Sequence, residues 1–185
     1  MTGIKDYPRV NINFNPEIPP LKKVKDKTKI DVRYSVISPF SFIHIYWDEK
    51  EYEVLYEIEE PILTDIEKGY LSQILPAMRD LIDFDVIIEK GIDKLLEYID
   101  KRLKIIAFEL GLNFSYDTYK KIYYYLVRDF VGFNEIEPLL RDFFVEDIEC
   151  NGNESPVYIV HRIFRNLKTN LSFNSMDKLE NFVEK

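Results

Sequence analysis

Cysteine and histidine are scarce in this 185-residue chain, which has one cysteine, Cys150, and two histidines. A single thiol cannot form a disulfide within the chain, and one thiol with two imidazoles is too small a set for a structural zinc site. The sequence also has no apolar run near the ~20 residues of a membrane-spanning helix, and it has no secretory leader. These absences favour a chain in the reducing cytoplasm.

Glycine is also sparse, since the six glycines lie isolated at positions 3, 69, 91, 111, 132 and 152. None of them opens the G-x-x-x-x-G-K-[ST] pattern, whose backbone amides hold nucleotide phosphates. We therefore expect no nucleotide hydrolysis by these 185 residues alone.

Side chains suited to catalysis are present, but their spacing does not indicate an active site. His44 lies in an aromatic strand pattern with no serine, cysteine or carboxylate at a catalytic spacing, so we expect a hydrogen-bonded core residue. Neighbouring acids lie beside predicted caps and turns, where carboxylates have local roles. These acids are Glu59 with Glu60, Glu135 with Glu137, and Glu146 with Asp147.

Acidic residues outnumber basic ones by 33 to 25, which gives a net charge of −8 and argues against a general nucleic-acid binder. The first 29 residues differ, because seven basic and three acidic side chains give them +4 and leave −12 for the rest. We interpret residues 1–29 as a flexible basic arm. It either contacts anionic lipid or an acidic partner, or is a solvated tail beside its own acidic body. Nucleic-acid binding through the arm is a third, less favoured hypothesis.

Residues 30–58 alternate between apolar and polar side chains with a period of two. The alternation covers residues 30–36, 40–47 and 52–58, with turn residues between the segments. We predict three antiparallel strands. Because the segment 40–47 is apolar at nearly every position, it should lie in the centre and be buried on both faces.

Two amphipathic helices follow the strands. Thr64 is a suitable N-cap for the first, whose apolar positions include Ile66, and Pro76 predicts a kink or break within it. The second carries apolar residues from Ile92 to Leu110 and stops at Gly111. A third, tyrosine-rich helix begins near Ser115. The short connections predict an antiparallel three-helix bundle that presents a surface.

The stretch from Tyr123 to Phe173 combines several features. Gly132 should end the third helix in a left-handed turn. A short helix over 134–143 and two strand segments, 147–150 and 157–160, should then follow, with an Asn-Gly turn between the strands. Four basic side chains cluster after the second segment, at His161, Arg162, Arg165 and Lys168.

Residues of this stretch resemble the N-terminal region of archaeal type II/IV secretion system ATPases, the hexameric motors of archaella and type IV-like pili. The resemblance spans about 50 residues. It is carried by Gly132, Ile136, Pro138-Leu139-Leu140, Asp142, Val145-Glu146-Asp147-Ile148, Cys150-Asn151-Gly152, Pro156-Val157-Tyr158, His161-Arg162, Leu167, Thr169-Asn170 and Phe173.

The resemblance implies a division of labour within a longer protein. ATP and Mg²⁺ would be held by a separate C-terminal ATPase domain, and no cofactor would bind to the present chain. Arginines of the N-terminal region reach the nucleotide phosphates in this family, which implies that role for Arg162 and, second, Arg165. The alternative is that both arginines are solvated and pair with Glu146, Asp147 or Glu149.

The family also implies partners and a location. The partners are the chain's own ATPase domain, neighbouring subunits of a hexamer, a polytopic membrane platform protein and other secretion or filament components, with no nucleic acid. The location is the cytoplasm, peripheral at the inner face of the cell membrane.

Together these patterns predict an α+β chain in three parts. A basic arm, 1–29, precedes a module of antiparallel strands and a helix bundle, 30–131, and then the first part of a small mixed α/β domain, 132–185. The pattern of a capped apolar helix after Asn174 suggests a domain cut at Lys185. The expected function is a non-catalytic regulatory and docking region of a secretion ATPase. The alternative is a stand-alone adaptor module.

Overall fold

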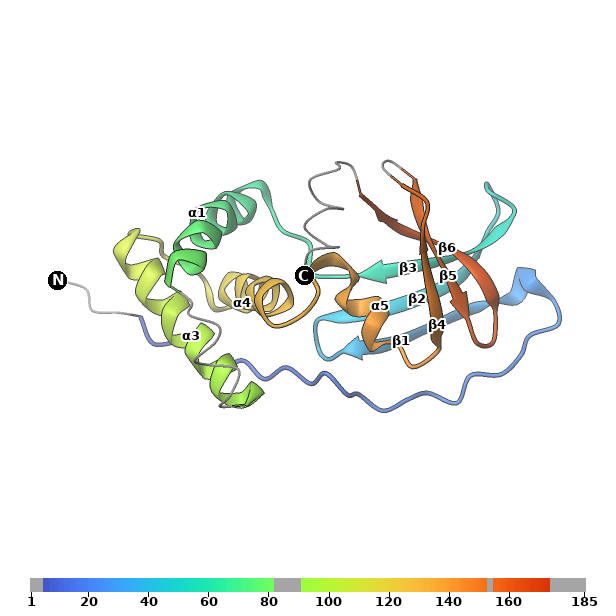
Figure 1. The fold of residues 1–185 in the computed structure, drawn as a ribbon, viewed down its shortest axis with the longest axis horizontal. Helices are drawn as coiled ribbons and strands as arrows, with labels where there is room; N and C mark the ends of the chain where they lie inside the picture. Colours follow the sequence, from blue (N-terminus) through green and yellow to red (C-terminus); the bar gives the residue numbers. More distant parts are fainter. Residues whose placement is uncertain (1–4, 82–90, 153–154, 174–185) are drawn as a thin grey trace. The chain divides into compact units, whose positions relative to one another are not determined.

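A computed structural model describes residues 5–81, 91–152 and 155–173 (Figure 1). The chain divides into two compact units, each built from two stretches of sequence. The helical unit contains Met1–Asn11 and Pro61–Gly132, and the sheet unit contains Ile12–Glu60 and Phe133–Lys185. The predicted α+β class is confirmed. The helix predicted after Asn174 lies outside the described residues.

The sheet unit contains one six-stranded sheet with the strand order β1-β2-β3-β6-β5-β4. Its strands are β1 (Asp31–Ile37), β2 (Ser41–Asp48), β3 (Glu53–Glu59), β4 (Val145–Cys150), β5 (Pro156–His161) and β6 (Arg165–Ser172). Neighbouring strands are antiparallel except β3 and β6, which are parallel. The three strands predicted over 30–58 are thus confirmed, with β2 between β1 and β3.

This arrangement differs from the division expected from the sequence, because β1–β3 do not form a module with the helices. They continue into the C-terminal strands through β6, which the sequence did not lead us to predict. The Asn170 side chain helps to join β3 to β6: its Nδ2 donates to Ile58 O at 3.0 Å, and its Oδ1 accepts from Ile58 N at 2.9 Å. The side-chain amide of Asn170 thus satisfies both the N–H and the C=O of Ile58, as a backbone peptide of a neighbouring strand would.

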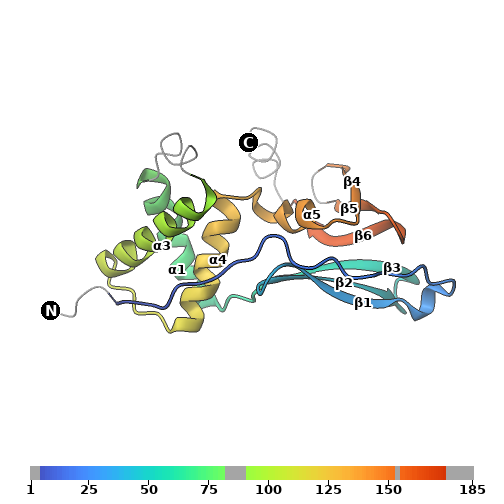
Figure 2. The same ribbon diagram turned by 90° about the horizontal axis from the view of Figure 1, so that it is seen from below.

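A short helix, α5 (Glu137–Arg141), follows the 3-10 turn η2 (Asn134–Ile136) and contacts both edge strands, β1 and β4. Figure 2 shows the sheet curving, with β1–β3 on one side and β4–β6 on the other. The buried side chains of the sheet unit come from both halves and from α5: Tyr34, Val36, Ile43, Ile45, Tyr56, Leu139, Phe144, Val157, Ile159, Leu167 and Phe173. The unit therefore has one shared core.

Strand β2, which lies between β1 and β3, is buried on one face and not on both. Ile43 and Ile45 are fully buried, whereas the alternating His44 has a side chain that is 27% exposed. The His44 ring contacts the Asp31 carboxylate, with 2.8 Å between Nε2 and Oδ1. The expectation of a core histidine was therefore wrong, because the apolar run continues across a partly solvated face.

The helical unit contains α1 (Asp65–Leu81), α3 (Ile92–Glu109) and α4 (Tyr116–Phe130), and each of the three contacts the other two. Helix α1 runs through Pro76 without a break. The apolar faces of α3 and α4 are buried largely as predicted, through Leu95, Ile99, Leu103 and Ile106 of α3 and Tyr119, Ile122, Tyr123, Leu126 and Val127 of α4.

Two glycines end helices in different ways. Gly111 follows α3 with a φ of 67°, as its position predicts. Gly132 follows α4 and donates its N–H to Val127 O at 3.3 Å, but it is not left-handed. Asn134 has the positive φ instead, at 54°. The predicted end of the helix was correct and the predicted conformation of Gly132 was wrong.

The N-terminal residues do not form the free arm that their composition suggested. Within the helical unit, Tyr7 is buried, its ring stacks on Tyr119 with centroids 4.1 Å apart, and its hydroxyl donates to Phe114 O at 3.0 Å. Within the sheet unit, Asn13 exchanges two backbone hydrogen bonds of 2.9 Å with Ser38. Tyr7 and Asn13 are thus held by packing and hydrogen bonds, whereas the lysines at positions 22, 23, 25, 27 and 29 are exposed.

Within residues 5–81, 91–152 and 155–173, no helix has both the length and the apolar character needed to cross a membrane. The same residues include no group of three histidine, cysteine or acidic side chains arranged to hold a metal ion.

Candidate functional site

A buried carboxylate, Asp142, lies where α5 ends and receives hydrogen bonds from two strands. Tyr34 of β1 and Tyr56 of β3 donate their hydroxyls to Asp142 Oδ2, at 2.6 Å and 2.8 Å. The Phe144 N–H donates to Asp142 Oδ1 at 2.9 Å. Hydrogen bonds to a charged group each contribute roughly 1.5–3 kcal/mol, so this carboxylate fixes α5 against the sheet.

His161 extends the network from the end of β5, where it is fully buried. Its Nδ1 accepts the backbone N–H groups of Ile163 and Phe164, both at 3.2 Å. The ring proton must then be on Nε2, which lies 3.4 Å from the Tyr34 oxygen. The geometry indicates a chain of donors from His161 through Tyr34 to Asp142.

The network is neutral at its histidine end. Burial, with the nearby Arg162 charge, lowers the pKa of His161 from 6.5 to about 4. Burial raises the pKa of Asp142, and hydrogen bonds from Tyr34, Phe144 N–H and Tyr56 oppose that rise. Burial and the Asp142 charge raise the pKa values of Tyr34 and Tyr56 far above the ordinary value. The tyrosines are thus fixed as donors, which suits a structural role better than proton transfer.

A groove of about 240 Å³ opens beside this network. Its walls are residues 14–19, Tyr34–Val36 of β1 and Leu140–Phe144, which include the end of α5 and the residues after it. Three large apolar side chains on its walls are about half exposed: Ile18 at 50%, Leu140 at 48% and Phe143 at 53%. We call this feature the apolar groove. Its shape suits recognition of a ligand or a partner.

Arg162 lies in the turn between β5 and β6 and is partly exposed. Its Nε donates to Glu146 Oε1 at 3.2 Å, and its guanidinium lies 4.5 Å from the centroid of the Phe143 ring. The pairing with Glu146 is one that the sequence suggested as the alternative to a phosphate contact. An ion pair with both side chains over 40% exposed is weak and is easily exchanged.

The other basic residues of the predicted cluster are dispersed. Arg165 is exposed at the start of β6 and has a φ of 69°. Lys168 forms ion pairs with Glu51 and Glu53, the latter at 3.8 Å. His161 is inside the core. Arg162 and Arg165 are therefore exposed at the β5–β6 connection, whereas the His161 side chain is buried and Lys168 is engaged by glutamates.

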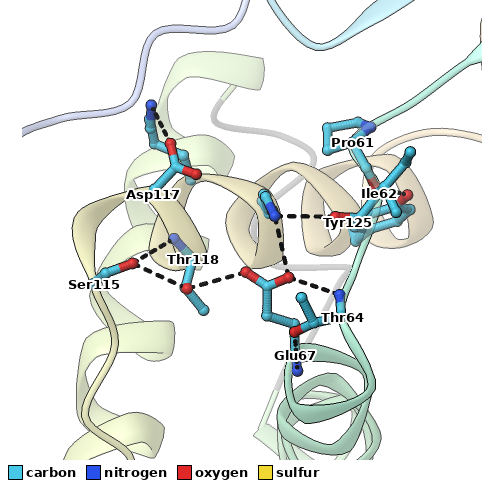
Figure 3. Close-up of polar contacts among 10 residues, drawn as sticks. Pro61, Ile62, Thr64, Glu67, Ser115, Asp117, Thr118 and Tyr125 are labelled. Atoms are coloured by element: carbon cyan, nitrogen blue, oxygen red, sulfur yellow. Dashed lines mark hydrogen bonds and ion pairs between the residues drawn. The ribbon is translucent and has the colours of Figure 1, made fainter.

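A second polar cluster lies in the helical unit around Glu67 (Figure 3). Thr64 and Glu67 form a capping box, in which Thr64 N–H donates to Glu67 Oε2 at 2.8 Å and Glu67 N–H donates to Thr64 Oγ1 at 3.2 Å. Thr118 and Lys121 of α4 also donate to the Glu67 carboxylate, at 3.0 Å and 3.1 Å. Glu67 thus joins the start of α1 to α4.

This cluster corrects the predicted face of α1. Ile66, expected in the core, is 68% exposed, and Glu67 is buried. Burial by itself raises the pKa of Glu67, but hydrogen bonds from Thr64 N–H, Lys121 and Thr118 outweigh it and lower the pKa. With all its oxygens engaged, Glu67 has a structural role.

Few sequence signals indicate the buried carboxylate or the apolar groove. Asp142 follows Arg141 in Leu-Leu-Arg-Asp-Phe-Phe, and an acid within such a largely apolar stretch is a signal of a buried polar contact. Its partners are 108 and 86 residues away, so no local pattern could identify them.

No family model matches the sequence. Two curated relatives are similar to it, both from Methanocaldococcus jannaschii. Uncharacterized protein MJ1288 is 31% identical over 163 residues, which cover 88% of this chain and 64% of the relative. Uncharacterized protein MJ0900 is 26% identical over 181 residues, which cover 88% of this chain and 32% of the relative. The chain therefore spans under two thirds of the first relative and about one third of the second.

Proposed function

We propose that this chain is a non-catalytic N-terminal regulatory and docking region of a hexameric secretion-type ATPase, one that drives assembly of an archaeal pilus or archaellum, or protein secretion. The observation that carries the proposal is the dense resemblance over residues 132–173. Many of its residues are buried in the sheet unit: Ile136, Pro138, Leu139, Asp142, Val157, His161, Leu167, Thr169 and Phe173. A resemblance at core positions supports a shared fold.

The catalytic machinery belongs, in this proposal, to a separate C-terminal domain. That domain holds ATP and Mg²⁺, because the present sequence has no phosphate-binding glycine loop. One relative has room for such a domain, since about two thirds of its length lies outside the match. Both relatives are archaeal, in agreement with the proposed filament systems.

The proposed partners follow from this assignment. They are the chain's own ATPase domain, the neighbouring subunits of the hexamer and a polytopic membrane platform protein. The location is the cytoplasm, peripheral at the inner face of the membrane. Lys22, Lys23, Lys25, Lys27 and Lys29 are all exposed, which supports contact with an anionic membrane surface.

Arg162 is the proposed phosphate contact, with Arg165 second. The Arg162 side chain is 46% exposed and uses Nε for Glu146, so its Nη groups can reach a phosphate. A guanidinium stays charged at any working pH and forms two parallel hydrogen bonds with phosphate oxygens.

The proposal is tested first by the mass of the natural protein, detected in cell extracts with an antibody against this chain. A band well above 22.1 kDa supports a further domain, and a band at 22.1 kDa supports the stand-alone adaptor instead. In the full protein, Arg162→Ala should slow ATP turnover. The matched control is Arg33→Ala, which removes another partly exposed arginine paired with a glutamate, Glu59.

Two results would contradict the proposal. The first is ATP turnover by the 185-residue chain alone at the rate of the full protein. The second concerns Arg162 only: equal turnover in Arg162→Ala, Arg33→Ala and the natural protein would show that Arg162 forms no phosphate contact.

A further inference from the structure

We infer that two copies of this chain associate through the basic residues 22–29 of one copy and the solvent face of β1–β3 of the other. We call these two surfaces the lysine segment and the acidic face. The acidic face is formed by side chains that alternate along the strands with the buried Tyr34, Ile43, Ile45 and Tyr56. Its charged members are Asp31, Arg33, Asp48, Glu53, Glu57, Glu59 and, on the neighbouring strand β6, Lys168.

The register of the strands gathers these charged side chains on one face. Arg33, His44 and Glu57 lie directly opposite one another across β1, β2 and β3, and Asp48 lies opposite Glu53. Five acidic and two basic side chains give the acidic face a net charge of −3 when His44 is neutral. The side chains of Asp31 and Glu53 are 79% and 44% exposed. The acidic face is therefore negatively charged and open to solvent.

Ion pairs within the chain neutralise only part of the acidic face. Arg33 pairs with Glu59 at 2.6 Å, and Lys168 pairs with Glu53 at 3.8 Å and with Glu51 of the adjoining turn.

Two carboxylates of the acidic face have no cation paired with them among the described residues, Asp48 and Glu57. Both act on the middle of the face: burial raises the pKa of Tyr46, and the negative charges of Glu57 and Asp48 raise it further. A surplus of negative charge thus remains after the internal ion pairs have formed, and it favours a cationic partner.

The lysine segment has the complementary charge. Five lysines and Asp26 give residues 22–29 a net charge of +4, and all eight residues are exposed. The one ion pair of the segment among the described residues is internal and joins Lys29 to Asp26 at 3.3 Å. The other four lysines therefore have no carboxylate partner in their own chain. The end of the segment is fixed, because Trp47 N–H of β2 donates to Ile30 O at 3.0 Å.

Both surfaces belong to the sheet unit, so every copy of the chain supplies both. The whole chain has a net charge of −8, and the lysine segment is the place at which it attracts the acidic face of another copy. In a pair related by a two-fold axis, the lysine segment of each copy contacts the acidic face of the other, so the contact forms twice. The inference does not depend on the ATPase assignment.

The test is analytical ultracentrifugation of the 185-residue chain at low and high salt. At low salt the average mass should exceed the monomer mass of 22.1 kDa, and at high salt it should fall to that mass, because salt screens exposed charges. Lys22→Glu with Lys25→Glu should weaken the association by about tenfold or more. The matched control is Lys94→Glu with Lys101→Glu, which makes the same change of charge at two exposed lysines of α3 and should associate like the natural chain.

Exchange of charge between the two surfaces tests whether they contact each other. Glu53→Lys with Glu57→Lys should also associate weakly by itself. A mixture of this double variant with the Lys22→Glu, Lys25→Glu variant should associate like the natural chain, because each reversed surface then meets one of opposite charge. A variant that fails to fold is not rescued by mixing, and fluorescence of Trp47 in β2 verifies that each variant is folded.

Three results would overturn the proposal: a natural chain that stays at 22.1 kDa at low salt, equal weakening by the α3 control variant, or a mixture of the two reversed variants that stays monomeric. Vesicles of anionic phospholipid test the other ligand of the lysines. Binding to these vesicles that requires Lys22 and Lys25, by a chain that is monomeric without them, would assign the lysine segment to lipid headgroups and also overturn the proposal.

Discussion

The Tyr34 hydroxyl donates to the Asp142 carboxylate at 2.6 Å across 108 residues of sequence. Tyr34 belongs to the first strand of the sheet and Asp142 to the end of α5. Because α5 contacts both edge strands, this one hydrogen bond helps to join the two halves of the sheet unit.

Removal of the buried carboxylate should destabilise the sheet unit. Asp142→Ala leaves the hydroxyls of Tyr34 and Tyr56 buried without their acceptor, so we expect a loss of about 3 kcal/mol in the free energy of unfolding. Urea unfolding followed by Trp47 fluorescence measures it, because Trp47 lies in β2 of the same unit. Asp147→Ala removes an exposed carboxylate of β4 and should change little. Equal losses in the two variants would contradict a special role for Asp142.

His161 should make the sheet unit less stable in mild acid. Its pKa is about 4 in the folded chain and ordinarily 6.5, so between these values the unfolded chain binds more protons. The contribution is complete above pH 6.5 and falls by roughly 3 kcal/mol as the pH drops to about 4 and below.

Comparison of two variants separates the contribution of His161 to the free energy of unfolding from the contributions of other titrating groups. His161→Gln should remove most of the slope of unfolding free energy against pH in this window, whereas His44→Gln should retain it. Asp142 opposes the trend, because its raised pKa adds stability at low pH. The idea fails if His161→Gln and the natural chain have the same slope.

Glu67 should stabilise the start of α1 and its contact with α4. Glu67→Ala removes the capping box and the acceptor for Thr118 and Lys121, so we expect a loss of about 2 kcal/mol. Hydrogen exchange over residues 65–75 and 116–125 should become faster. Asp65→Ala, at a neighbouring exposed acid, is the control and should leave both segments protected.

The Glu67 carboxylate also makes stability depend on pH, but at a lower pH than His161 and through loss of a negative charge. Since the pKa of Glu67 is lowered, its contribution is present above the ordinary value of 4.5 and is lost as the pH falls through the lower folded value. The Glu67→Gln variant should lack this acid-induced increase in exchange.

Tyr7 should hold the N-terminal segment on the helical unit. Tyr7→Ala loses the stack on Tyr119 and the bond to Phe114 O, so trypsin should cleave after Arg9 at least several times faster. Phe108→Ala removes a half-exposed aromatic of the same unit and should not change that rate. Equal cleavage of the natural chain and Tyr7→Ala would mean that the segment is not held by this stack.

Local signals in the sequence predicted local structure well. The alternation over 30–58 gave β1–β3, and Thr64 and Ser115 cap their helices through hydrogen bonds to Glu67 N–H and Thr118 N–H. Each of these features depends on residues within a few positions of one another. The residues that cause each feature therefore lie within a short stretch of sequence.

Features that depend on distant residues were missed. In β6, Leu167 and Thr169 are buried and alternate with Lys168 and Asn170, but the two buried positions are too few to distinguish this period of two from a basic loop. Strand β6 pairs with β5, which is close in sequence, and with β3, which is over 100 residues earlier. The choice between grouping β1–β3 with the helices or with β6 depends on the pairing with β3.

The parallel pairing of β3 with β6 also sets an order of events during synthesis. Ile58 and Asn170, which bond to each other, are separated by 112 residues, and the three helices of the helical unit are encoded between them. At about 5–20 residues per second, on the order of 10 s passes between the synthesis of β3 and that of β6. During that time the edge of β3 lacks its permanent neighbour, while the residues of α1, α3 and α4 have all been made. A nascent chain paused near Gly132 therefore contains α1, α3 and α4 together with β1–β3, and still lacks α5 and β4–β6.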